Sequence, residues 1–438
     1  MSREAPHGAG SSVLPPGSGR DDRGRLTIGG CAVGELLRAV GTPAVLVEED
    51  ALRDAARAYV RAFPSPDARP SVYFASKAFP CPAVIRVFAQ EGLGCDVASA
   101  GELAIALAGG MAPERILMHG NAKTDEELSA ALVAGVGLIV VDSLDELDRL
   151  DRLVRERQAV LLRVNPAVAA PTHAAMATGH EGSKFGLSPA HLQIAIDRTQ
   201  RHPLLRLEGL HAHVGSQITE LEPFAGAVEA LAGLGRFATY DLGGGLGARY
   251  TPEQPEPPGV QAYAQRLLDA ARRHLPPEAR ILVEPGRSLV ARSAVTVYTV
   301  VSVKRAARTF VSVDGGMGDN LEPMLYQTPF APLVLDAERP LERCDVVGRH
   351  CETGDRLVEG AMLASPRVGD ALVVPVTGAY CYSTSNNYNG ACRPPVLLCS
   401  GGRARIVVRR ETTADLLARS CDVPVGPEML AQGVATWQ

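Results

Sequence analysis

From about Thr42 to Val290, short apolar runs rich in β-branched residues alternate with longer stretches rich in Ala, Leu, Glu and Arg. The short runs predict strands and the longer stretches predict helices. The predicted strands are Val45–Val47, Val72–Ala75, Ile116–Met118, Leu138–Val141, Val160–Val164, Leu207–His211, Thr239–Leu242 and Ile281–Val283. The predicted helices are Ala51–Ala62, Cys81–Gln90, Asp125–Ala134, Leu144–Arg155, Pro189–Arg198, Pro223–Leu231 and Val260–Arg273. About eight such units over roughly 250 residues predict a parallel (β/α)8 barrel of the TIM type.

After Arg292 the pattern changes to strand-like segments separated by Gly, Pro and Asp turns. The segments are Val295–Lys304, Thr309–Val313, Ala371–Pro375, Val396–Cys399 and Ala404–Arg409. This pattern is typical of a mostly antiparallel β domain. We therefore predict an α/β protein with four parts: a flexible N-terminal tail (1–25), an N-terminal segment that packs with the β domain (26–47), the barrel (48–291) and a C-terminal β domain (292–438).

Composition excludes several classes of protein. The chain is 46% hydrophobic with a net charge of −5, which supports a full core and gives no reason to expect nucleic acid or an anionic membrane as a partner. The longest apolar run, Ala130–Val141, is shorter than the roughly 18–20 residues of a membrane-spanning helix, and the N-terminus lacks the apolar stretch of a secretory signal. The nine cysteines form no CxxC pair, which favours reduced thiols in a cytoplasmic protein over disulfides or a zinc site.

Lys77 is the first candidate for a catalytic residue. It is the last residue of the run Val72–Lys77, which begins with the predicted strand Val72–Ala75. Functional groups of a TIM barrel lie just after the C-terminal ends of its strands. Partial desolvation there is expected to lower the pKa of the lysine and make its amine a nucleophile. The alternative, a surface lysine, is the commoner place for this residue type.

His211 and His213 follow another predicted strand and lie on the same side of the chain. They are candidate metal ligands, but no acidic residue or cysteine accompanies them at metal spacing. We therefore expect no metal. Stacking of the flat imidazole of His213 on a flat cofactor ring is the more plausible role, and Ser216 can then bind a phosphate.

Two glycine-containing motifs follow later strands. Gly243–Gly247 allows backbone N–H groups to surround an anion such as a monophosphate, although a tight turn would use the same residues. In the second motif, Glu284 can keep the pyridine nitrogen of a cofactor protonated, which makes the ring an electron sink. Arg287 offers a fixed fork for a phosphate or a carboxylate. The alternative is a buried structural pair of Glu284 and Arg287.

In the β domain, Cys351 and Glu352 lie next to each other in a predicted loop, and Tyr380 lies in another. Decarboxylation through an electron sink leaves a carbanion that must be protonated. A thiol, with a reference pKa of about 8.5, is a competent acid for that step. The alternative is that Cys351 is a small buried apolar residue.

Together these motifs resemble the pyridoxal 5'-phosphate-dependent decarboxylases of the alanine-racemase fold (fold type III), and most closely the diaminopimelate decarboxylases. The resemblance runs from about Gly41 to Leu417. It rests on the following motifs: Tyr73–Ala78, Cys95–Leu103, His119–Lys123, Thr178–Gly186, His211–Gln217, Gly243–Gly247, Glu284–Arg287, Asp314–Met317, Cys351–Asp355, Gly378–Tyr380 and Ser385–Asn389.

The resemblance implies a role for each matching residue. Lys77 corresponds to the Schiff-base lysine and His213 to the ring-stacking histidine. The implied cofactor contacts are Ser216, Gly243, Gly244, Gly245, Glu284, Gly286, Arg287 and Tyr380. The implied substrate contacts are Arg287, Glu322, Tyr326, Glu352 and Tyr380. Cys351 and Glu352 correspond to residues donated by the partner subunit of a homodimer, and the implied reaction converts meso-diaminopimelate into L-lysine and CO2.

The chain departs from the family at one position. Diaminopimelate decarboxylases usually read Arg-Pro-Ala-Leu-Tyr, with the arginine on a substrate carboxylate, where this chain reads Glu322-Pro323-Met324-Leu325-Tyr326. At about 4 Å this reversal changes the interaction by several kcal/mol. Either Glu322 turns away and another base such as Arg287 suffices, or the substrate is a basic, carrier-bound or amide-masked amino acid without that carboxylate. The retained Thr178–Gly186 motif favours the first alternative and the charge reversal favours the second.

Two other functions remain open for this fold. An amino-acid racemase would need a base, typically a tyrosine, opposite the lysine and would not need the Cys351–Glu352 pair. A non-catalytic cofactor-binding homologue would be expected to lack Lys77, His213 or Cys351, and all three are present.

Overall fold

The computed structural model describes residues 12–165 and 183–422. Eight parallel strands form a barrel in chain order: β5 (Tyr73–Ala75), β6 (Gly94–Val97), β7 (Ile116–Met118), β8 (Leu138–Val141), β9 (Gln158–Arg163), β10 (Leu205–His211), β11 (Thr239–Asp241) and β12 (Arg280–Leu282). The barrel closes between its first and last strands, where Tyr73 N donates to Val283 O (2.9 Å) and Val283 N donates to Ser71 O (3.0 Å). The predicted TIM barrel is confirmed.

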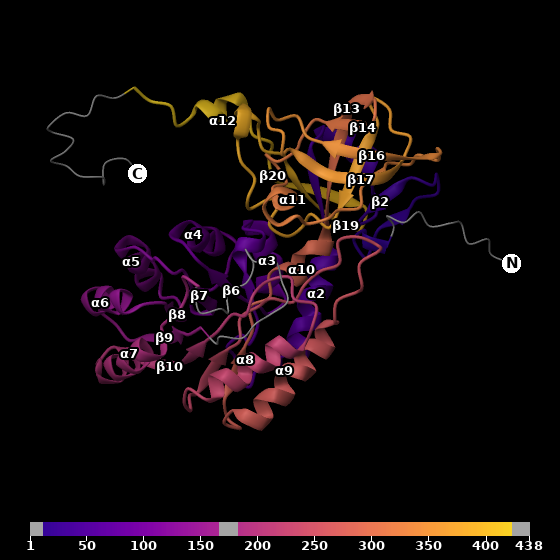
Figure 1. Ribbon diagram of the computed structural model, residues 1–438. Coiled ribbons are helices and arrows are strands. Elements are labelled where there is room, and N and C mark those ends of the chain that lie inside the picture. The colour runs from indigo at the N-terminus through magenta and orange to yellow at the C-terminus, as the bar shows by residue number, and fades with distance from the viewer. Residues whose placement is uncertain (1–11, 166–182, 423–438) are drawn as a thin grey trace.

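Helices surround this barrel (Figure 1). They are α2 (Glu49–Ala62), α3 (Pro82–Gln90), α4 (Ala100–Ala108), α5 (Asp125–Ala134), α6 (Leu144–Leu153), α7 (Pro189–Arg201), α8 (Glu222–Ala232), α9 (Val260–His274) and α10 (Arg287–Val290). Several begin at a side-chain cap; Thr124 and Glu127, for example, form a capping box at the start of α5. The caps fix where each helix leaves the loop that follows a strand, and these loops carry the candidate residues.

The first predicted barrel strand belongs elsewhere. Val45–Val47 lies in β4 (Ala44–Glu48), which pairs antiparallel with β13 and parallel with β19 in the β domain. Counting Val45–Val47 among the eight barrel strands is therefore wrong; these residues pair within the β domain, with which we expected residues 26–47 to pack. The barrel takes β6 instead, which the apolar pattern misses because Gly94 and Asp96 are both disfavoured in strands.

The β domain contains one large mixed sheet, drawn mainly in orange in Figure 1. Its strands are β4, β13 (Ala294–Arg305), β14 (Thr309–Val313), β15 (Leu333–Val334), β16 (Leu341–Val347), β17 (Arg356–Ala364), β18 (Ala371–Pro375), β19 (Val396–Ser400) and β20 (Arg403–Val408). All the strand pairs but β14–β16 and β4–β19 are antiparallel, so the mostly antiparallel prediction is confirmed. The short helix α11 (Glu322–Tyr326) lies in the connection between β14 and β15, and the short helix α12 (Thr413–Leu417) follows β20.

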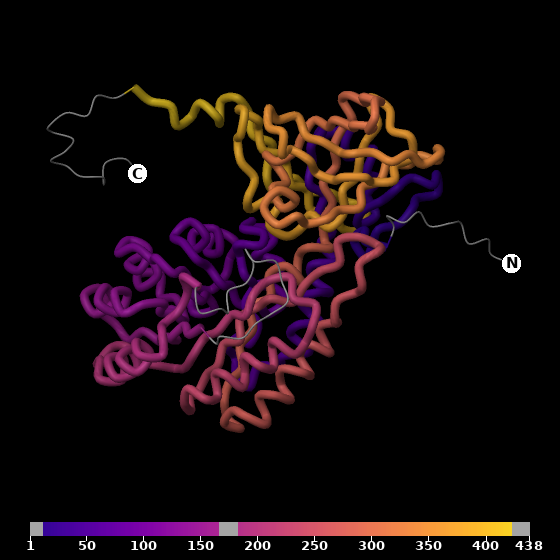
Figure 2. The backbone as a smooth tube through the Cα atoms, in the orientation of Figure 1, coloured from indigo at the N-terminus to yellow at the C-terminus, as the bar shows by residue number. Residues whose placement is uncertain are grey.

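The N-terminal part of the described chain is more ordered than predicted. β1 (Gly19–Arg20) pairs with β2 (Leu26–Ile28), which pairs with β3 (Cys31–Ala32), and α1 (Val33–Val40) follows. Val13 and Leu14 are buried, so the predicted flexible tail does not extend over residues 12–25. Residues 1–11 lie outside the described residues. Figure 2 shows the N-terminal chain running within the β domain before it enters the barrel helices.

No helix among the described residues is long and apolar enough to cross a membrane.

Candidate active site

A layer of polar side chains lies at the C-terminal end of the barrel interior. Below it, apolar residues of the strands form a separate buried cluster that includes Leu117, Leu161 and Leu282. Side chains two residues apart in a strand point to the same face. The inward positions two residues after those leucines are therefore His119, Arg163 and Glu284, and the same alternation leads to Asp96, Asp142, His211 and Asp241 on other strands.

A cavity of about 590 Å³ lies directly above this layer, within the usual range for a small-molecule site. Most of the predicted site residues line it: Lys77, His213, Ser216, Gly244, Gly245, Glu284, Gly286, Arg287, Glu322, Tyr326 and Tyr380. Residues from the β domain thus close a cavity whose floor is the barrel.

Three predicted residues do not line this cavity. Gly243 lies next to it and donates from its N–H to Asp241 Oδ1 (2.9 Å). Cys351 and Glu352 are exposed on the loop between β16 and β17. The chain's own cavity therefore lacks the predicted acid pair, which remains a prediction for a neighbouring subunit.

Lys77 lies in a single 3₁₀ turn, Ser76–Ala78, directly after β5, and its side chain is accessible from the cavity. Burial lowers the pKa of Lys77, but the negative charge of Asp96, together with Tyr380 and Glu284, outweighs burial and raises the pKa above its usual value. The lowered pKa expected from the sequence is therefore wrong in this structure. The acidic residues that raise this pKa, Asp96 and Glu284, lie on or directly after strands other than β5.

Glu284 is held by two buried histidines. His119 Nε2 forms a short hydrogen bond with Glu284 Oε1, and His211 Nε2 lies 3.3 Å from Glu284 Oε2. Burial lowers the pKa of His119 to about 3 and also lowers that of His211, so both rings are neutral donors near neutral pH. Burial by itself would raise the pKa of Glu284, but the histidines lower it well below its usual value.

The same histidines reopen the question of a metal. Donor atoms of His119, His211, Asp241 and Glu284 all lie within 4.8 Å of one another. The sequence argument against a metal, that no acidic partner is close, therefore does not hold in three dimensions. However, both oxygens of Glu284 already accept hydrogen bonds from the histidines, and burial and repulsion by Glu284 raise the pKa of Asp241 well above its usual value. With both Glu284 oxygens taken by the histidines, this cluster offers a cation few unengaged donor atoms, which favours an organic ligand here.

The glycines after β11 allow the backbone of neighbouring loops to approach so closely that a side chain would clash. A Cβ on Gly244 would lie 2.2 Å from Glu284 O, and one on Gly245, at φ +120°, would lie 2.5 Å from Gly215 O. Gly244 N donates to His213 Nδ1 (3.1 Å), which fixes the imidazole beside the glycines. Burial lowers the pKa of His213 well below its usual value, so its ring is neutral and suited to stacking.

Pyridoxal 5'-phosphate fits this donor set. Lys77 offers an amine, Glu284 an ionised carboxylate for a protonated ring nitrogen, and His213 a neutral flat ring. Ser216, Gly244 and Gly245 line the cavity together and are suited to a phosphate. The orphaned Nδ1 of buried His211 and Oδ1 of buried Asp96 show that the polar layer has bonding capacity left for a ligand.

Glu322 is not turned away from the cavity. Its Oε2 lies 3.1 Å from Arg287 Nη1 and accepts a 3.1 Å hydrogen bond from Thr328 Oγ1. Arg287 also forms a short hydrogen bond with Tyr250 OH, and its guanidinium carbon lies 4.7 Å from the centre of the Tyr380 ring. Nη1 of Arg287 is therefore taken up by protein partners, whereas its buried Nε has no hydrogen-bond partner among the described residues, so the guanidinium predicted to be a fixed fork is only partly engaged. The first alternative, in which Glu322 has moved aside, is wrong in this structure.

Several lining residues were not assigned a role from the sequence: Asp96, His119, Lys123, Arg163 and His211. Two of the quoted motifs, Cys95–Leu103 and His119–Lys123, contain three of them, but only the alternation along the strands shows that their side chains meet. Lys123 is satisfied by Glu146 (2.9 Å), Gly120 O and Val140 O, so it is a structural residue. Residues 178–182 of the Thr178–Gly186 motif lie outside the described residues.

Comparison with known proteins agrees with this geometry. Residues 49–291 match the family described as pyridoxal-dependent decarboxylase, pyridoxal binding domain. The chain is 45% identical to a diaminopimelate decarboxylase of Actinosynnema pretiosum subsp. auranticum, over 91% of this chain and 93% of that protein, and 40% identical to one of Mycobacterium tuberculosis (93% and 97%).

Solved structures are similar as well. Diaminopimelate decarboxylase from M. jannaschii in complex with L-lysine has a TM-score of 0.87 at 29% identity, covering 95% of this chain and 99% of that one. The Helicobacter pylori enzyme complexed with L-lysine has a TM-score of 0.82 at 30% identity, covering 88% and 98%. The chain belongs to the pyridoxal-dependent decarboxylase family, whose members are carboxy-lyases that use pyridoxal 5'-phosphate.

Proposed function

We propose that this chain removes a carboxylate from an amino acid with pyridoxal 5'-phosphate held on Lys77, and that the substrate is meso-diaminopimelate, which gives L-lysine and CO2. The observation that carries the proposal is the cavity in which the amine of Lys77 and the doubly hydrogen-bonded carboxylate of Glu284 both lie. The relatives named diaminopimelate decarboxylase and the neighbours solved with L-lysine support this substrate.

When bound, the cofactor supplies an electron sink for the bond that breaks. The protein holds a proton at the ring nitrogen through Glu284, whose charge the neutral histidines leave uncompensated. His213 would pack against the face of the cofactor ring, and Ser216 with the backbone of the glycine motif would hold the phosphate. Together these residues would orient the substrate bond that breaks.

A homodimer with shared active sites is part of the proposal. The described lining residues of this cavity include no cysteine, whereas Cys351 and Glu352 are exposed on a loop of the β domain. A partner subunit that inserts this loop would supply the Sγ proton of Cys351 to the substrate carbon and the carboxylate of Glu352 to the substrate amine. The cytoplasmic location predicted from the cysteines also stays a prediction.

The test is substitution of Lys77 by alanine in the cofactor-loaded protein. We expect Lys77→Ala to abolish the visible absorbance of the lysine-bound cofactor and the release of CO2 from meso-diaminopimelate, because no other amine among the described residues of the cavity is free: Lys123 is bound on three sides. Cys351→Ala is the companion variant and should keep the absorbance while it slows turnover. Absorbance that survives Lys77→Ala would contradict the proposal.

A second candidate substrate is favoured by the pair of Glu322 and Arg287. The two side chains are 1% and 4% exposed and form an ion pair, so the described residues at this end of the cavity offer a distal carboxylate only a cation whose charge Glu322 already neutralises. A related decarboxylase substrate, either a basic amino acid or one whose carboxylate is masked as an amide or on a carrier, fits a neutral wall better.

Release of CO2 from a panel of substrates separates the two candidates. The panel contains meso-diaminopimelate, lysine, ornithine, arginine and glutamyl conjugates. Highest kcat/KM for meso-diaminopimelate supports the first candidate, and highest kcat/KM for a substrate without a free distal carboxylate supports the second. Interconversion of D and L forms without CO2 would contradict both and would favour a racemase.

A further inference from the structure

Residues 380–393, which we name the bridging segment, connect two places that the proposed function uses. Its one short helical turn, Tyr388–Gly390, includes Asn389 at φ +54°, and Tyr380 has φ +65°. A positive φ is unusual for a residue with a large side chain and persists only where surrounding contacts hold it. The conformation of the segment is therefore set by its anchors.

One end of the bridging segment is fixed to the loop that carries Lys77. Tyr380 N donates to Ala78 O (2.8 Å), the residue next to Lys77. The ring of Tyr382 stacks on that of Phe79 with centres 4.9 Å apart and planes 14° from parallel. These contacts bring Tyr380 to the cavity, where its ring lies against the guanidinium of Arg287.

The other end is fixed to the loop that carries Cys351. Asn389 Oδ1 accepts a hydrogen bond from Cys351 N (2.9 Å), and the rings of Tyr388 and His350 lie 5.7 Å apart. Asn386 N donates to Gly318 O (2.7 Å), and Gly318 N in turn donates to His350 Nε2 (3.1 Å). The backbone of Cys351 is thus positioned by the same segment that positions Tyr380.

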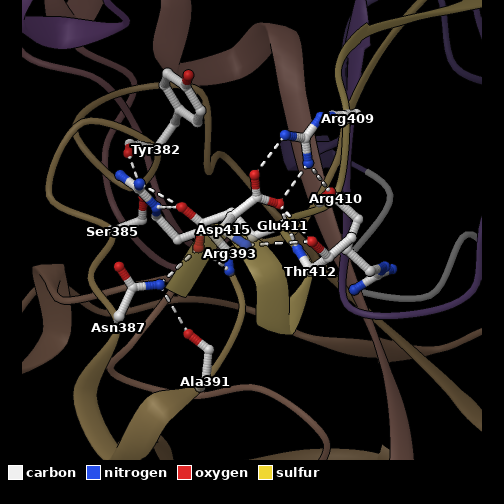
Figure 3. A network of polar contacts seen from close by, with 10 residues as sticks. All are labelled: Tyr382, Ser385, Asn387, Ala391, Arg393, Arg409, Arg410, Glu411, Thr412 and Asp415. Atoms are coloured by element: carbon white, nitrogen blue, oxygen red, sulfur yellow. Dashed lines mark hydrogen bonds and ion pairs between the residues drawn. The ribbon is translucent and has the colours of Figure 1, made fainter. Parts of the chain in front are cut away.

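Glu411 anchors the C-terminal half of the bridging segment (Figure 3). Its Oε2 accepts hydrogen bonds from Asn387 Nδ2 (2.6 Å) and Arg393 N (2.9 Å), and its Oε1 accepts a hydrogen bond from the guanidinium of Arg393. Glu411 N donates back to Arg393 O (3.1 Å). Asn387 Nδ2 also donates to Ala391 O (2.9 Å), which closes the turn that contains Asn389.

We propose that Glu411 is a positioning residue which, through Arg393 and Asn387, holds the bridging segment in the conformation that places both Tyr380 and Cys351. It touches neither the cavity nor Lys77. In the proposed homodimer, Tyr380 serves the chain's own site and Cys351 serves the partner's, so one carboxylate sets the geometry of both sites. Only this last consequence rests on the proposed function.

A neighbouring ion pair provides a matched control. Asp415 accepts two hydrogen bonds from Arg409 (2.6 and 2.5 Å) and caps α12, and the hydrogen bonds of its carboxylate to described residues go to Arg409 and Thr412 rather than to the bridging segment; Figure 3 shows both pairs. Asp415→Asn and Glu411→Gln are both acid-to-amide changes in arginine pairs. Only Glu411→Gln should affect the site.

The experiment compares the cofactor-loaded full chain with Glu411→Gln and Asp415→Asn. We expect Glu411→Gln to lower kcat about tenfold, since misplacement by 1 Å costs up to about 100-fold, with a smaller change in KM. Alkylation by iodoacetamide, followed for each cysteine by peptide mass spectrometry, should become severalfold faster at Cys351 and at Cys392, which lies in the segment. Cys421, also exposed and outside the segment, is the internal reference and should not change.

Asn387→Ala provides a milder second variant if Glu411→Gln does not fold, because it leaves Glu411 paired with Arg393. It should accelerate alkylation at the same cysteines to a lesser extent. Alkylation and kcat of Glu411→Gln equal to those of Asp415→Asn would overturn the inference. If the unmodified protein releases no CO2 from any substrate, the proposed function fails, whereas the alkylation pattern still decides whether Glu411 positions Cys351.

Discussion

Two buried glutamates lie in the wall of the same cavity, and their partners give them opposite roles. Glu284 is 7% exposed and its partners are histidines whose pKa burial lowers, so the pair keeps a net negative charge. Glu322 is 1% exposed and its partner is Arg287, which is always charged, so that pair is neutral. A buried carboxylate thus presents a negative charge to a ligand when its partners are neutral histidines. It presents no net charge when its partner is an arginine that stays protonated.

Among the substitutions that test this comparison, Glu284→Gln should lower kcat the most. The amide cannot hold a proton on the ring nitrogen of the cofactor, and loss of one such electrostatic contact typically costs about 100- to 1,000-fold in kcat. Steady-state CO2 release from the cofactor-loaded variant measures it. Glu322→Gln is the matched control, since it makes the same change in the neutral pair, and it should cost far less. Equal losses in both variants would mean that the two carboxylates do not differ in role.

Glu322→Arg tests the neutral pair directly. It replaces an anion with a cation at the end of the cavity, and we expect about a tenfold rise in kcat/KM for meso-diaminopimelate if the native substrate lacks the distal carboxylate. Glu322→Gln, which releases Arg287 without adding a second cation beside it, should give a smaller rise. If both variants turn over meso-diaminopimelate at an unchanged or lower rate, the altered-substrate candidate is contradicted.

Much of this site could be predicted from the sequence, because barrel strands deliver their following residues to one end. Lys77, His213 and Glu284 meet in one cavity for that reason. What could not be predicted depends on neighbours from distant strands. The pKa of Lys77 rises because Asp96 faces it, and β6, which carries Asp96, gives no strand pattern because Gly94 and Asp96 interrupt its apolar residues.

Glu322, in the β domain, is a second residue whose partners could not be predicted from the sequence. Its sequence position shows a charge reversal relative to the family, but the direction of its side chain depends on Arg287 after β12 and on Thr328 two residues beyond α11. Strands β16 and β17 were missed because charged residues and Gly360 interrupt their apolar alternation. Local patterns predict elements, whereas ion pairs between elements require the assembled structure.

The dependence of stability on pH provides the smallest and most direct check of the histidine–glutamate side of the comparison. The pKa of His119 falls from its ordinary value near 6.5 to about 3 on folding, because burial penalises the charged ring. Below pH 6.5 the unfolded chain therefore binds a proton that the folded chain does not, and the free energy of unfolding decreases as the pH falls. Between pH 6.5 and 5, His119 therefore lowers the free energy of unfolding by about 1 kcal/mol for each unit by which the pH falls.

His119→Asn removes that proton and keeps a hydrogen-bond donor for Glu284. Denaturant unfolding of the cofactor-loaded protein at pH 7.5, 6.5 and 5.5 should give a shallower decline for His119→Asn than for the unmodified chain, even if the variant is less stable throughout. Glu322→Gln should leave the slope unchanged, because the guanidinium of Arg287 stays protonated over this range. A slope that is the same in all three proteins would mean that His119 is already charged in the folded state, and that Glu284 belongs to a neutral pair just as Glu322 does.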